Sequence, residues 1–177
     1  MGPVIAFLRM LGIMNAAVWL GAALFFTFGI APAFFTPEMK KLLGEIYAGL
    51  VAQLVLERYF VLHYCCGSIA LAHQLAEWVY LGKRLQKFTF GLLLTILILA
   101  VCSGAGLAPR LKELHRVKYS PQSSPAQKEE AAATFRTWHG VSQVMNILVL
   151  AGLAAFAWRL TIPANNGPRF APGKFRS

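Results

Sequence analysis

Four polar side chains interrupt an otherwise apolar helical segment near the C-terminal end of the chain. They follow the i, i+3, i+4, i+7 spacing of one helical face and are His139, Ser142, Gln143 and Asn146. A neutral histidine can donate from one ring nitrogen and accept at the other, and side-chain amides can do both. We therefore expect a hydrogen-bonded network inside a helix bundle, with Arg110 as its charged neighbour because the preceding apolar segment ends beside that residue.

A second polar line runs through residues 59–82 and contains His63, His73, Gln74 and Glu77. Its simplest role is interhelical hydrogen bonding that sets helix rotation, since unpartnered polar groups are costly in lipid. One alternative is a haem b or metal site held by His63 and His139, because imidazole binds iron, copper and zinc. Another is a proton or solute path along His73, Gln74 and Glu77.

Catalysis is the weakest of the alternatives. Ser142 lies one helical turn from His139, but a nucleophile and its base also need an orienting group and an oxyanion hole. No such third group is identifiable, so we expect no enzymatic activity and no resident cofactor.

The segments that carry these side chains have the composition of membrane spans. The chain is 57% hydrophobic and only 14% charged, against roughly 45–50% and 25% in soluble domains. Residues 10–36 and 88–109 contain no charged side chain, and each such block is long enough to cross a bilayer. We predict an all-α integral membrane four-helix bundle with up-down topology and spans at about 10–35, 59–82, 88–109 and 137–158.

The connecting segments complete a four-span domain over residues 1–162. Residues 37–58 are predicted to form an amphipathic helix continuous with the second span, and Ser124-Pro125-Ala126-Gln127 is a capping box that starts the fourth helix before its span. The second and fourth helices should therefore extend beyond the membrane. Residues 110–124 are predicted to be an outer loop and 163–177 a flexible tail. We identify no internal repeat.

The net charge of +10 does not indicate nucleic-acid binding, because the basic residues are scattered around span boundaries instead of forming one face. The short turn with Lys83, Arg84 and Lys87 and the basic C-terminal segment favour cytoplasmic placement of both termini.

Several motifs, in their order along the chain, carry a family resemblance. "WLGAALFFTFGIAPAFF", "LAPRLKEL" and "FRTWHGVSQVMNILVL" resemble the transmembrane protein 205-like family, also called domain of unknown function 4149. The resemblance implies a four-helix integral membrane protein, placed in the inner membrane in bacteria, and it implies no reaction. We expect an accessory or structural subunit, or a small-solute factor. Its partners would be the lipid bilayer and either a larger membrane complex or further copies of the chain.

Overall fold

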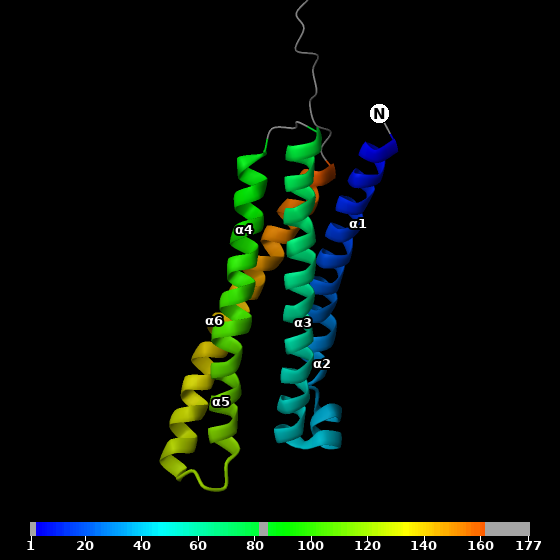
Figure 1. The fold of residues 1–177 in the computed structure, drawn as a ribbon. Helices are drawn as coiled ribbons and strands as arrows, with labels where there is room; N and C mark the ends of the chain where they lie inside the picture. Colours follow the sequence, from blue (N-terminus) through cyan, green and yellow to red (C-terminus); the bar gives the residue numbers. More distant parts are fainter. Residues whose placement is uncertain (1–2, 82–84, 162–177) are drawn as a thin grey trace, which may run out of the picture.

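The computed structural model describes residues 3–81 and 85–161, all of whose regular elements are helical (Figure 1). The predicted tail 163–177 and the basic residues Lys83 and Arg84 lie outside this part. The elements in chain order are α1 (Pro3–Phe25), η1 (Phe26–Ile30), α2 (Ala31–Ala33), α3 (Pro37–Leu81), α4 (Lys87–Val101), η2 (Cys102–Leu107), α5 (Ala108–Tyr119) and α6 (Pro125–Thr161).

Four helical segments of the described chain are long and apolar enough to cross a membrane. They run Ala6–Ala33, Pro37–Tyr80, Lys87–Tyr119 and Pro125–Thr161. The prediction of an all-helical protein with four apolar helices is confirmed at this level.

The first and third of these segments contain the same local interruption. In both, Ala-Pro follows a π-helical turn, in which Ala31 N–H bonds to Phe26 C=O and Ala108 N–H bonds to Ser103 C=O. A proline removes one backbone donor and its ring crowds the carbonyl four residues earlier, so a wider turn before it accommodates the ring. The sequence around each break is Gly-Ile-Ala-Pro or Gly-Leu-Ala-Pro, ending at Pro32 and Pro109.

The second and fourth segments also begin alike. Thr36 and Ser124 precede the first proline of α3 and α6, and their carbonyls accept from the N–H of Lys40 and Lys128, at 3.0 Å in each case. The predicted capping box is confirmed, since Gln127 N donates to Ser124 Oγ at 3.3 Å and Ser124 N donates to Gln127 Oε1 at 2.8 Å. The two halves of the chain, α1–α3 and α4–α6, therefore share a proline break and a later helix that starts at a proline.

The two halves meet around a small core and separate toward one end. Trp19, Leu93, Ile96 and Leu153 are almost fully buried where α1, α3, α4 and α6 pack together. From its start beside α5, α6 crosses the molecule obliquely and ends behind α3 (Figure 1). A cleft lies between α3 and the first half of α6.

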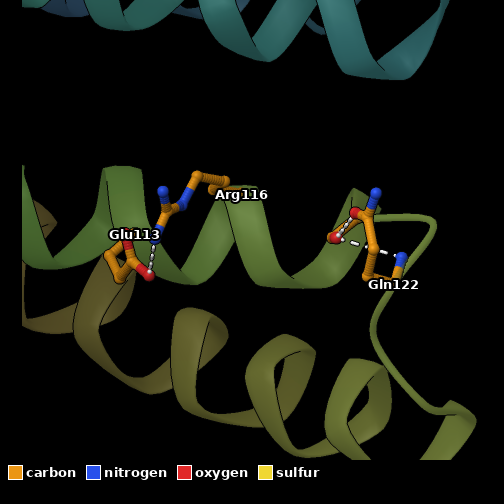
Figure 2. A network of polar contacts seen from close by, with 4 residues as sticks. Glu113, Arg116 and Gln122 are labelled. Carbon is orange, nitrogen blue, oxygen red and sulfur yellow. Dashed lines mark hydrogen bonds and ion pairs between the residues drawn. The ribbon is translucent and has the colours of Figure 1, made fainter.

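Residues 110–124 differ from the predicted loop, because helix α5 continues to Tyr119 and only residues 120–124 connect it to α6. Pro109 does not end the helix, because the π-helical turn before it accommodates the proline ring. Leu111 and His115 form its buried face. Its outer face carries the exposed ion pair of Glu113 with Arg116, at 2.7 Å, before the turn that contains Gln122 (Figure 2).

The α5 helix also contacts α3 across the space between the halves. The ring of His115 covers the backbone of Gly49 so closely that a Cβ there would collide with Nε2. Near the start of α3, Gly44 has φ 71° and ψ 161°, which breaks the helix and turns its first residues away from the long part. Glycine adopts this conformation without the clash that a side chain would bring.

Candidate functional site

A cleft of about 940 Å³ lies between the two halves. It is lined by α3 on one side and by α5 and α6 on the other, and residues of both π-helical turns, Thr27 and Ser103 among them, reach it. The repeated breaks thus lie around one shared cavity. Its volume falls within the roughly 300–1,000 Å³ of small-molecule sites.

His63 is the last residue of α3 that lines the cleft, and Trp19 of α1 holds it there. The part of the cleft around His63 is called the floor. The two side chains are 1% and 0% exposed, and Trp19 Nε1–H donates to His63 Nδ1 at 2.8 Å. Because an indole N–H only donates, Nδ1 must accept and the proton of the neutral ring is on Nε2. Nε2 makes no hydrogen bond with any other residue of the described chain. His63 therefore has a ring N–H without a hydrogen-bond acceptor in the described chain, and its ring meets the Tyr59 ring edge to face, with centroids 4.3 Å apart.

Asn146 joins three elements beside this floor. Its Oδ1 accepts from the Tyr59 hydroxyl at 2.9 Å, and its Nδ2 donates to Thr27 Oγ1 at 2.8 Å. Phe26 stacks on the Tyr59 ring with centroids 4.0 Å apart. This network connects α6 and α3 to the first π-helical turn, and all of its polar atoms have partners within the protein.

The polar face predicted on α6, called the α6 ribbon, consists of His139, Ser142, Gln143 and Asn146. Its members other than Asn146 line the cleft without such partners. His139, Ser142 and Gln143 line the cavity, and their side chains form no hydrogen bond with other residues in the described ranges. The His139 ring is parallel to Phe135, with centroids 5.7 Å apart. Across the cleft, Gln53 Oε1 on α3 is buried without a hydrogen-bond partner. The walls thus combine aromatic surface with unused polar atoms.

Charged side chains line only the rim of the cleft, on the first part of α3 and on α5. Lys112 Nζ and Glu57 Oε1 are 3.1 Å apart, and the Tyr119 hydroxyl donates to Glu45 Oε2 at 3.3 Å. Both contacts join α5 to α3 across the mouth. The remaining charged lining residues are Lys40 and Lys118.

The other predicted polar residues are placed elsewhere. The Arg110 guanidinium lies over the Trp138 ring, 5.2 Å from its centroid, and is not part of the cleft lining. His73 Nε2 is 2.7 Å from the Leu8 carbonyl, at the interface of α3 with α1. Gln74 Oε1 is buried without a partner there, and Glu77 is half-buried further along α3. The second polar line is therefore separate from the α6 ribbon, and of its residues only His63 reaches the cleft.

Three residues of the site were not singled out from the sequence: Trp19, Thr27 and Tyr59. Each is an ordinary residue of an apolar span, so composition gives no signal. The repeated Gly-x-Ala-Pro segment is the one feature that could have indicated where Thr27 lies, just before the first break.

A family model described as "Domain of unknown function (DUF4149)" matches residues 14–120. The chain belongs to this family. The matched part of this DUF4149 chain includes both proline breaks and the α3 wall of the cleft, whereas His139 and Asn146 follow it. No curated protein and no solved structure matches the chain.

Proposed function

We propose that this DUF4149 protein is a non-enzymatic membrane protein that binds a small molecule in the cleft between its two halves. The observation that carries the proposal is the cavity itself, with aromatic walls and several polar atoms that have no protein partner. Buried polar groups are normally hydrogen-bonded, so the buried and unpartnered Gln53 Oε1 in the cavity lining favours a ligand that uses it. The half-buried His139 and Ser142 offer such a ligand further polar atoms.

The proposed membrane arrangement is an up-down bundle in a bacterial inner membrane with both termini in the cytoplasm. The 37 residues of α6 correspond to roughly 55 Å at 1.5 Å per residue, against about 30 Å for the hydrocarbon core. The excess length supports extension of α3 and α6 beyond the membrane on one face. The charged rim lies toward that end, so the cleft would open to the outside.

The haem or metal alternative is disfavoured by the tautomer of His63. Coordination through Nε2 would move its proton to Nδ1, which already faces the Trp19 N–H at 2.8 Å. Two donors would then point at each other. The His/Cys/Asp/Glu side chains of the described part also form no group of three suited to a metal.

An accessory role within a complex is the second candidate, and an exposed stripe on α3 supports it. Ile46, Leu50 and Leu54 recur at four-residue steps after the break at Gly44 and are all exposed on the part of α3 before the predicted span. A partner protein or a second copy of the chain would cover this stripe. The wider transmembrane protein 205-like assignment rests on the motif order and is likewise part of the proposal.

Native mass spectrometry of protein extracted from its own membrane tests small-molecule binding. Ser142→Trp fills the cleft, and Leu148→Trp is the matched control because Leu148 is on the same helix, 53% exposed and outside the cleft lining. We expect a discrete small-molecule adduct on the wild type and the control that is absent from Ser142→Trp. An adduct that persists in Ser142→Trp, or the absence of one from all three proteins, would contradict the proposal.

A further inference from the structure

We propose that the cleft selects an uncharged amphipathic molecule with a hydrogen-bond-accepting oxygen at the end that enters the cleft first. This oxygen binds His63 Nε2–H. This inference rests on the proposed function and specifies the chemical class of its ligand.

At the floor of the cleft, His63 requires a ligand atom that accepts a hydrogen bond. Trp19 fixes the tautomer of His63, so the nitrogen left for a ligand carries a proton and can only donate while the ring is neutral. The ring is 1% exposed and borders the cleft, and no other residue of the described chain accepts a hydrogen bond from its Nε2. A carbonyl, ether or hydroxyl oxygen of a ligand would satisfy it.

The depth of the cleft requires a neutral ligand. The five charged lining residues lie on the first part of α3 or on α5, and each of them contacts another of the five or Tyr119. The deeper lining, with Tyr59, Phe60 and Ser103, has no charged side chain to compensate an ion. Moving an ion into such a site is costly because its hydration is lost. An uncharged ligand oxygen loses a hydrogen bond from water but gains one from the His63 N–H.

The walls require an apolar body with room for one further polar group. Phe26 stacked on Tyr59 and Phe135 stacked on His139 present flat aromatic surface. Gln53 Oε1, on α3 between Glu45 and Glu57, is a buried acceptor without a protein partner in the cleft lining. A ligand with a flat or chain-like apolar body and a donor partway along it would match this arrangement.

Three naphthalene probes of similar size separate these requirements. Uncharged 2-acetylnaphthalene has the acceptor, naphthalene lacks it, and 2-naphthoate has a charge in its place. Equilibrium partition into nanodiscs that contain the protein, with protein-free discs subtracted, measures the binding of each. We expect saturable binding of the ketone, weaker binding of naphthalene, and binding of the carboxylate at least about tenfold weaker than the ketone.

The variant Trp19→Phe/His63→Leu removes the floor donor together with its partner, so that no buried polar group is left unpaired. Ketone binding should fall about two- to tenfold and naphthalene binding should not change. Trp19→Phe alone keeps the histidine and should retain part of the ketone preference. Size-exclusion chromatography and thermal unfolding confirm that each variant is folded.

The outcomes distinguish the two proposals. Equal binding of ketone and naphthalene, a preference for naphthoate, or no effect of the double variant would overturn the ligand class while leaving a small-molecule cleft intact. If no probe binds saturably, or if Ser142→Trp does not reduce binding, both the ligand class and the proposed function fail.

Discussion

Replacing Asn146 by leucine should destabilise the protein, whereas the same replacement of His139 should not. Both residues belong to one polar ribbon in the sequence, but only Asn146 has protein partners. Asn146→Leu removes two hydrogen bonds, of 2.9 Å to Tyr59 and 2.8 Å to Thr27. Intramembrane hydrogen bonds contribute about 0.6–1.7 kcal/mol each, so the loss should be about 1–3 kcal/mol.

His139 forms no hydrogen bond within the described chain, so His139→Leu removes only its ring contact with Phe135. Its cost should stay below about 0.5–1 kcal/mol, because leucine retains apolar contact with the wall. The free energy of unfolding is measured by SDS titration in mixed micelles with ligand-depleted protein. A double-mutant cycle with Tyr59→Phe should give a coupling of about 0.6–1.7 kcal/mol with Asn146→Leu.

Two results would refute the assignment of a stabilising role to Asn146 but not to His139. One is a destabilisation by His139→Leu that equals or exceeds that of Asn146→Leu. The other is a coupling between Tyr59 and Asn146 that cannot be distinguished from zero, which would mean that their hydrogen bond does not form in the folded protein.

Two further predictions concern the second break and the orientation in the membrane. Gly104→Ala should cost about 1–3 kcal/mol, because an added Cβ would lie 2.9 Å from Phe60 Cγ as well as against the Tyr64 hydroxyl. Gly106→Ala meets no neighbouring atom and should be neutral or stabilising, and SDS titration measures both. Cysteines at Ser123 and Ser177 should react with a membrane-impermeant maleimide from opposite sides of the membrane, and labelling of both from one side would contradict the proposed topology.

The four spans were predictable because their physical cause is local. A segment such as 88–109, without one charged residue, has few other stable environments than a bilayer or a large core. The start of α6 was predictable for the same reason, since Ser124 and Gln127 complete their hydrogen bonds within one turn. Both features are independent of how the helices pack.

The site depends on helix rotation and crossing, which local pattern does not determine. Spacing places His139 and Asn146 on one face, but the oblique path of α6 decides that Asn146 meets Tyr59 while His139 lines the cleft. Because proline disrupts helices, the sequence alone favours Pro109 as the end of a span. The π-helical turn before it lets the helix continue. This turn is seen in the structure before both Pro32 and Pro109, and the sequence pattern alone does not predict it.

Protection of one cleft cysteine tests the central claim most directly. Ser142→Cys is made in a variant without the three native cysteines, which are all free thiols, and Leu148→Cys is the control. A water-soluble maleimide should label Cys at position 142, and saturating 2-acetylnaphthalene should slow that labelling without slowing it at position 148. No labelling at 142, or equal rates with and without the ketone, would contradict an open, ligand-binding cleft between the two halves.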